Sequence, residues 1–231
     1  MTYNLDHQPP KIFFLNKHRP KGLEFPSCRV CNKQSARHEP VVAFYARALG
    51  NHRLEDGSLD KGFDRARRAV ERSFPSLIEQ TRRDTLVVRN GLLQPALAFD
   101  VNHQQVRTSA GIVAAKLGLA MYYLQFHRPA PVTVRIGTMW THKQNMERAQ
   151  IVNRLLKSLP HDIYLKQGED WDTQDTFFIR HFAEGETFWM VAIIHGCISL
   201  IAQVTNTATT AHRVVGELVW SPVGGRGIQL V

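Results

Sequence analysis

The segment that most constrains the fold is Thr108–His127, TSAGIVAAKLGLAMYYLQFH. Its apolar residues occupy most sides of a helix rather than a single stripe, and such a helix is stable only when neighbouring elements cover it. We therefore predict that it is the buried central helix of the second structural unit of the chain. A chain of 231 residues is long enough to bury a core of this kind, as one domain or as two small ones.

The residues before this segment predict further helices. In residues 40–49, PVVAFYARAL, apolar positions recur at helical spacing after a proline that suits a first helical turn. Residues 59–84 predict an amphipathic helix that Pro75 should kink or divide. The arginines of this helix have two interpretations, a phosphate-binding surface or only a solvated helix face.

The residues after the central helix predict a sheet. PVTVRIGTMW, residues 131–140, has the composition of a strand, and residues 143–159 follow as an amphipathic helix. In residues 176–206 apolar strands are broken at Gly185 and Gly196, a pattern typical of antiparallel hairpins. The fold class that we predict is α+β.

The net charge of +9 is unevenly distributed. Up to Asn90 the chain carries 17 Lys and Arg against 10 Asp and Glu, so most of the excess lies in the first part of the chain. A basic region favours a polyanionic partner, most commonly nucleic acid. The alternative is that the charge serves solubility alone.

The sequence predicts no membrane association. No apolar run reaches the roughly 18 residues that a bilayer-spanning helix needs. The N-terminus has no apolar core of the signal-peptide type, because Asp6, His7 and two prolines interrupt it. We expect a cytoplasmic protein.

Three cysteines, Cys28, Cys31 and Cys197, are too few for a disulfide framework. A C-x-x-C pair in a reducing compartment indicates either half of a metal site or a redox pair. The redox interpretation needs a strand that leads into a helix at the first cysteine. The surrounding EFPSCRVCNKQS is rich in proline, serine and lysine and predicts a turn, which favours a metal site.

Asp6 and His7 stand far from Asn32 in sequence, but the intervening chain has the length of a hairpin that would bring them together. Hydrolysis of a phosphodiester with one metal ion needs a hard cation held by oxygen ligands and a base that activates water. Asp6 and Asn32 can supply the oxygens, and the imidazole of His7 suits the base. Cys28 and Cys31 supply half of a tetrahedral zinc site that would brace the hairpin.

This combination resembles the HNH endonucleases, the ββα-metal nucleases. LDHQPPKIFFLNKHRPKGLEFPSCRVCN is similar to their bacterial D-H-x-P-P-K…R-P-x-x-L…P-x-C-x-x-C-N form over about the first 35 residues. The resemblance implies His7 as the general base, Asp6 and Asn32 as ligands of catalytic Mg²⁺ or Mn²⁺, and Cys28 and Cys31 as structural zinc ligands. It also implies DNA as the substrate. The basic side chains beside these motifs are candidate phosphate contacts: Lys11, Arg19, Lys21 and Lys33.

The chain departs from this pattern in two places. Members of this form carry an upstream C-x-x-C that completes the zinc site, and MTYNL before Asp6 has no cysteine or histidine. Gly22 stands where the middle asparagine of the family's name would lie. Two histidines are candidates for a replacement zinc ligand, but His18 is in a predicted loop and His38 in a predicted exposed first helical turn. Two ligands hold zinc poorly, so we expect either further residues upstream or a weakened site.

Two functions follow from these residues. The first is a metal-dependent endonuclease that hydrolyses phosphodiester bonds in DNA, weakened by the missing half-site. The second is a catalytically inactive HNH remnant that binds nucleic acid or another partner. The corresponding organisation is a partial ββα-metal module at residues 1–50 and, at residues 51–231, a domain of helices followed by antiparallel strands. The oligomeric state stays open.

Overall fold

The computed structural model describes residues 3–14, 24–50, 61–89, 91–131, 134–158, 161–163, 177–185, 187–206, 218–220 and 229–230. The elements at the N-terminal side are β1 (Tyr3–His7), the 3₁₀ helix η1 (Lys11–Phe13), β2 (Glu24–Cys28), α1 (Arg29–Ala36), α2 (Glu39–Gly50), α3 (Lys61–Ser73) and α4 (Leu77–Thr81). They are followed by β3 (Arg82–Arg89), β4 (Leu92–Phe99), α5 (Gln104–Phe126), β5 (Val134–His142), α6 (Met146–Ser158), β6 (His161–Ile163), β7 (Phe177–Glu184), β8 (Thr187–Ile194), β9 (Ile198–Asn206), β10 (Leu218–Trp220) and β11 (Gln229–Leu230).

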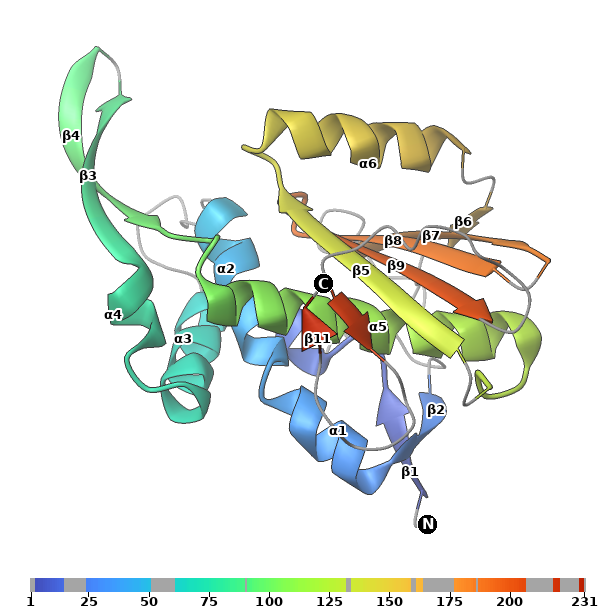
Figure 1. Ribbon diagram of the computed structural model, residues 1–231. Helices are drawn as coiled ribbons and strands as arrows, with labels where there is room; N and C mark the ends of the chain where they lie inside the picture. The colour runs from blue at the N-terminus through green and yellow to red at the C-terminus, as the bar shows by residue number, and fades with distance from the viewer. Residues whose placement is uncertain are drawn as a thin grey trace.

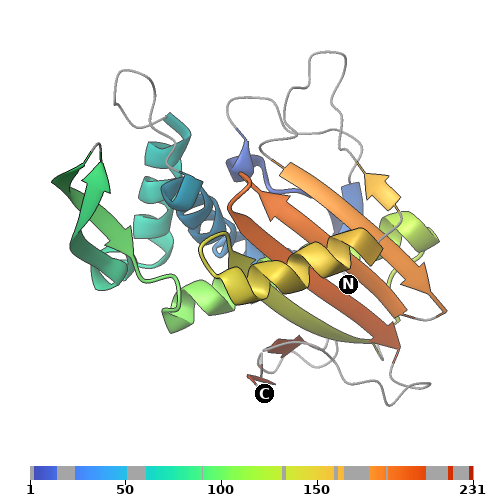
Figure 2. The same cartoon turned by 90° about the horizontal axis from the view of Figure 1, so that it is seen from above.

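The largest element of the fold is a seven-stranded antiparallel sheet with the order β11-β10-β5-β9-β8-β7-β6. Helix α5 covers one face of the sheet and α6 crosses the other, so the fold has three layers (Figures 1 and 2). Positive backbone φ angles at Gly185 and Gly196 form the turns between β7, β8 and β9, as the sequence predicts. The α+β fold class, with helices in the middle and an antiparallel C-terminal sheet, is confirmed.

Helix α5 is the buried central helix that its sequence predicts. Val113, Ala114 and Leu117 are at most 1% exposed, because α5 packs between the sheet and the N-terminal helices. Gly118 permits a close approach of α5 to the sheet, since a Cβ at this position would lie 2.6 Å from the Cβ of Ala202 in β9. Neither α5 nor any other helix in the described part of the chain is long and apolar enough to cross a membrane.

Helix α6 covers the opposite face of the sheet through a smaller apolar cluster. Val152 of α6 packs with Val191 of β8 and Ile201 of β9. These strands therefore bury side chains on both faces, which explains why their sequences are continuously apolar rather than alternating.

The N-terminal residues form a β-hairpin followed by a helix. Strands β1 and β2 pair antiparallel, with Asp6 opposite Phe25 and His7 opposite Glu24, and α1 starts directly after Cys28. Figure 1 shows this hairpin and α1 below α5, on the side of α5 that faces away from the sheet. The predicted boundary after residue 50 falls where α2 ends, next to residues 51–60, which lie outside the described chain.

Two local predictions in this hairpin are wrong. The apolar sequence KIFFL, residues 11–15, predicts a short strand, but Lys11–Phe13 form a 3₁₀ helix that buries Phe13 and Phe14. Pro9 and Pro10 precede this turn, and their missing N–H groups cannot support a sheet ladder. The second error concerns Cys28, which was expected in a turn but lies where β2 leads into α1, the arrangement that the redox interpretation of the C-x-x-C pair requires.

The hairpin of β3 and β4 was not predicted from the sequence, and it projects from the body of the molecule (Figures 1 and 2). The cross-strand register places Val88 opposite Leu93 and Leu86 opposite Pro95, so these side chains share one face. That face is apolar and exposed: Leu86, Val88 and Leu93 are 60%, 70% and 68% accessible to solvent.

Candidate functional site

Strand β1 presents Asp6 and His7 to different surroundings. Successive side chains of a strand point to opposite faces. Asp6 is accordingly buried at 6% exposure, whereas the side chain of His7 is 42% exposed. The two residues of the D-H pair therefore have separate environments.

The buried side of the hairpin converges on the ammonium group of Lys116, which comes from α5. Nζ of Lys116 lies 2.8 Å from Oδ2 of Asp6. It donates hydrogen bonds to Oδ1 of Asn32 at 3.1 Å and to Oε1 of Glu39 at 2.7 Å. We call these four residues, Asp6, Asn32, Glu39 and Lys116, the Lys116 cluster. It joins β1, α1, α2 and α5 at one point.

The Lys116 cluster is largely shielded from solvent. The side chains of Lys116, Asp6 and Glu39 are 9%, 8% and 17% exposed. Burial raises the pKa of the Glu39 carboxyl above its ordinary value, the ammonium of Lys116 partly offsets this, and the Asp6 carboxylate adds a smaller increase. Buried charges of this kind persist only when they are paired. Lys116 is thus the countercharge that lets two carboxylates share the site.

The donor set of the cluster matches the ligand chemistry of a hard divalent cation. Two carboxylates and a carboxamide oxygen are the groups that Mg²⁺ and Mn²⁺ prefer in proteins. Oδ2 of Asp6, although close to Lys116, is buried without hydrogen-bond geometry to any partner in the described chain. The structure therefore brings together Asp6 and Asn32, the two predicted metal ligands, and it adds Glu39 as a further oxygen donor.

His7 lies beside Glu24 on the other strand of the hairpin. Nδ1 of His7 is 3.0 Å from Oε1 of Glu24, and the two residues are directly opposite in the β1–β2 register. A carboxylate that accepts from Nδ1–H fixes the imidazole tautomer and leaves Nε2 as the basic nitrogen. Within the described residues no hydrogen bond or ion pair joins His7 to the Lys116 cluster.

Cys28 and Cys31 lie at the start of α1. Cys28 is the N-cap, and its Sγ accepts a hydrogen bond from the backbone N–H of Cys31 at 3.0 Å. Burial opposes ionisation of Cys28, but hydrogen bonds from Cys31 and Val30 outweigh it and lower its pKa. Burial, together with the neighbouring Cys28, raises the pKa of Cys31 to about 11. Neither thiol is in a disulfide.

No further zinc ligands accompany Cys28 and Cys31 in the described part of the chain. No group of three or more His, Cys, Asp or Glu side chains that could hold a metal ion is present there. His38, expected to be exposed, is buried at 4% exposure, and its Nδ1 lies 3.0 Å from Oγ of Ser109. Burial, with a smaller effect of Arg37, lowers the pKa of His38 to about 4. His38 therefore supports the helix packing and is not a replacement zinc ligand. His18 lies outside the described residues.

Of the predicted phosphate contacts, Lys11 and Lys33 are exposed, on η1 and α1 respectively. Arg19 and Lys21 lie outside the described residues.

A second basic surface lies along α3. A shallow hollow of about 350 Å³ is lined by Lys61, Asp64, Arg65, Arg68 and Arg72. The four basic residues recur at intervals of three or four, so they share one side of the helix. Arg65 donates to the backbone carbonyl of Phe14, just after η1, which ties this surface to the segment that follows Asp6 and His7.

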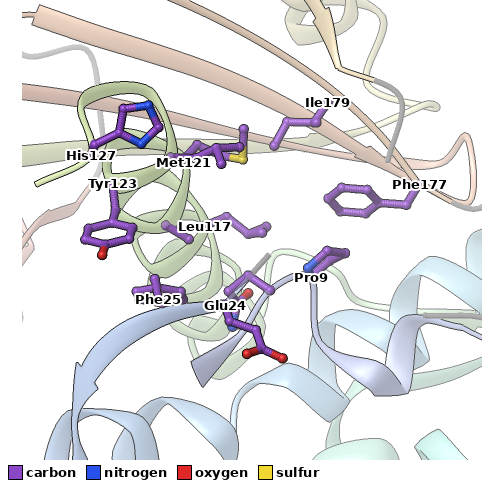
Figure 3. Close-up of a pocket in the computed structure, with 12 residues that line it drawn as sticks. Pro9, Glu24, Phe25, Leu117, Met121, Tyr123, His127, Phe177 and Ile179 are labelled. Carbon is purple, nitrogen blue, oxygen red and sulfur yellow. The ribbon is translucent and has the colours of Figure 1, made fainter. Parts of the chain in front are cut away.

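An apolar cavity lies between the hairpin, α5 and β7, and Figure 3 shows its lining. Its apolar lining includes Phe25, Leu117, Met121, Phe177 and Ile179, and the carboxylate of Glu24 points away from Leu117 and Met121. Its volume of about 60 Å³ is far below the roughly 300–1,000 Å³ of small-molecule sites. It is a packing gap beside the site and has no room for a nucleotide.

The sequence patterns did not predict Glu24, Glu39 or Lys116 as site residues. Glu24 and Glu39 flank the C-x-x-C segment, but an isolated glutamate carries no signal of its own. Lys116 had one detectable signal, because it is the only charged residue between Arg107 and Arg128 in an otherwise apolar helix. A lysine in that position requires a buried anionic partner.

No protein-family model, no curated protein and no solved structure matches this chain.

Proposed function

We propose that this chain is an HNH-type, metal-dependent endonuclease that hydrolyses phosphodiester bonds in DNA. The observation that supports this most is the convergence of Asp6 and Asn32 on one cation-binding point. These residues belong to different elements, and the hairpin-helix order brings their oxygens to the same ammonium group. The resemblance to the ββα-metal nucleases implies that both residues are ligands of one metal ion, and their position around one ammonium group supports that assignment.

The cluster oxygens would hold Mg²⁺ or Mn²⁺, with Glu39 as an additional ligand. Such a cation, when bound, polarises the scissile phosphate and stabilises the charge that develops on it. Nε2 of His7, on the face of β1 opposite Asp6, would accept a proton from the attacking water, and Glu24 would keep the imidazole in the tautomer that allows this. The 42% exposure of His7 gives water and a phosphate access to the ring.

The exposed cations position the DNA backbone. Lys11 and Lys33 flank the D-H and C-x-x-C motifs, and the basic row of α3 adds a longer surface on the side where Arg65 contacts Phe14. Contacts of this type hold phosphates without reading the bases. We therefore expect binding that depends strongly on salt and weakly on DNA sequence.

A structural Zn²⁺ is the least supported part of this proposal. Cys28 and Cys31 can hold a zinc ion only together with two further ligands. Those ligands would have to come from outside the described residues, because no larger metal-binding group exists within them.

A second candidate function is DNA binding without cleavage, by an inactive HNH remnant. The observation that favours it is Lys116, whose ammonium lies within 3.1 Å of the side-chain oxygens that a catalytic metal would need. If this lysine is never displaced, the site holds no metal and the exposed cations still bind phosphates.

Nicking of supercoiled plasmid DNA distinguishes these two candidates. With 5–10 mM Mg²⁺ or Mn²⁺ we expect the protein to convert plasmid to the open-circular form, and we expect His7→Ala to lose this activity at least a hundredfold. His142→Ala is the matched control, since His142 lies at the end of β5 and is also half-buried. Plasmid that is bound but never nicked, with either metal, would exclude the nuclease and support the inactive remnant.

A further inference from the structure

The ammonium of Lys116 has three N–H donors, and three side-chain oxygens surround it. One oxygen comes from each of Asp6 in β1, Asn32 in α1 and Glu39 in α2. Lys116 itself projects from the middle of α5, which is anchored by its apolar neighbours. The site is thus fully organised around a cation that belongs to the chain itself.

The Lys116 cluster contains two carboxylates and one ammonium, which favours a cation of higher charge. Two carboxylates face one ammonium, and Oδ2 of Asp6 has no hydrogen bond from a described residue. A divalent cation would balance both carboxylates, whereas the single positive charge of Lys116 balances one. A metal ion and the ammonium cannot occupy this point together, because two cations would lie within contact distance in a buried site.

We propose that Lys116 is the resident cation of the site and that a divalent metal binds to Asp6, Asn32 and Glu39 only by displacing it. This inference rests on the proposed function, because it identifies what controls metal entry at the same site. The Lys116 side chain has a flexible four-carbon stem, so its head group can leave while its backbone stays in α5. The consequence is that metal affinity is set by competition with a tethered cation.

Mn²⁺ binding measured by electron paramagnetic resonance of the free ion tests this proposal without reference to DNA cleavage. Lys116→Met removes the charge and keeps a side chain of similar length. We expect this variant to bind one Mn²⁺ at least tenfold more tightly than the unmodified protein. Lys157→Met, which removes an exposed charge on α6, is the matched control and should leave Mn²⁺ affinity unchanged. The double variant Asp6→Asn, Lys116→Met should lose the gain, because it lacks one of the oxygen anions.

Equal Mn²⁺ affinity of the unmodified protein and Lys116→Met, or no binding by either, overturns the proposal. If Lys116→Met does not fold alone, we expect millimolar Mn²⁺ to restore its circular dichroism spectrum, since the metal replaces the missing countercharge. Failure of Mn²⁺ to restore folding also overturns it.

Different results would reject the nuclease function and the competition between Lys116 and a metal ion. Tight Mn²⁺ binding by Lys116→Met, with no plasmid nicking by any variant, supports the cation competition and rejects the nuclease. Nicking by the unmodified protein, with equal Mn²⁺ affinity in Lys116→Met, supports the nuclease and rejects the competition.

Discussion

Asp6 and Lys116 form a buried ion pair, with Oδ2 and Nζ 2.8 Å apart and both side chains below 10% exposure. One residue lies on the first strand and the other in the middle of the central helix. The pair therefore connects the N-terminal hairpin to the main core of the molecule. Because removal of one partner of such a pair leaves the other charged and buried, its loss should be costly.

We predict that Asp6 and Lys116 are energetically coupled. In a double-mutant cycle of Asp6→Asn and Lys116→Met, measured by urea unfolding, we expect a coupling free energy of about 1 to 3 kcal/mol. The exposed pair of Arg82 and Asp84, with its atoms 3.3 Å apart, serves as the control and should couple by less than about 1 kcal/mol. Strictly additive effects of the Asp6 and Lys116 substitutions would contradict the role of Lys116 as a countercharge.

Gly118 lies where α5 packs closely against the sheet, so a larger residue at this position should destabilise the protein. In Gly118→Ala the new methyl group would lie 2.6 Å from the Cβ of Ala202, and backbone or strand must shift to accept it. We expect a loss of unfolding free energy of about 1 to 3 kcal/mol, as for other overpacked cores. Ala202→Gly removes the opposing atom, so the double variant should lose less stability than the two single variants together. A Gly118→Ala protein as stable as the original would contradict the close packing of α5 on β9.

Because His38 is buried, we expect the folded protein to lose stability in acid. Burial lowers the pKa of His38 in the folded protein to about 4, whereas a histidine in the unfolded chain has a pKa near 6.5. Between these values the unfolded chain binds a proton that the folded chain does not. Stability is therefore complete above pH 6.5 and falls as the pH decreases toward 4, by up to about 3 kcal/mol.

The variant His38→Asn isolates this effect, because its amide can still hydrogen-bond to Ser109 and does not titrate. Urea unfolding between pH 7 and pH 4 should show a smaller loss for the variant than for the original protein. Parallel pH profiles for the two proteins would show that His38 is not the source of the acid dependence.

The basic row of α3 predicts salt-dependent binding to DNA. Arg68→Gln with Arg72→Gln removes two exposed cations from the hollow along this helix. If both contact phosphates, the slope of log affinity against log salt should become less steep by about 0.9 for each contact. Arg154→Gln is the control, because Arg154 is exposed on α6, across the sheet from α5. Fluorescence anisotropy with a labelled duplex measures both slopes, and an unchanged slope in the α3 variant would exclude this surface.

The parts of the fold that were predictable from the sequence are those with a strong local pattern. The central helix, the division at Pro75 and the strand breaks at Gly185 and Gly196 are examples. The β3–β4 hairpin also has a signal in the sequence, the Asn90-Gly91 pair between two short apolar segments. A helical segment precedes the hairpin and β3 begins with charged residues, so the change from helical to strand periodicity is not evident in the sequence.

The candidate site was only half predictable, for a physical reason. Asp6 and Asn32 follow from a motif whose spacing encodes a hairpin. Lys116 reaches the same point from another part of the chain, and a contact between residues so far apart in sequence depends on how α5 packs. The lone charge of Lys116 in an apolar helix predicts a buried anionic partner, but a single sequence does not show that Asp6, Asn32 and Glu39 are the residues that meet it.

The position of Lys116 also limits how the protein can be dissected. Any fragment that ends before residue 116 keeps the carboxylates of Asp6 and Glu39 but loses the positive charge that compensates them. The hairpin and α1 contain few buried apolar side chains, so such a fragment has little else to hold it together. The minimal autonomous unit that contains Asp6 and His7 must therefore include α5, and an isolated N-terminal peptide would misrepresent the behaviour of the whole chain.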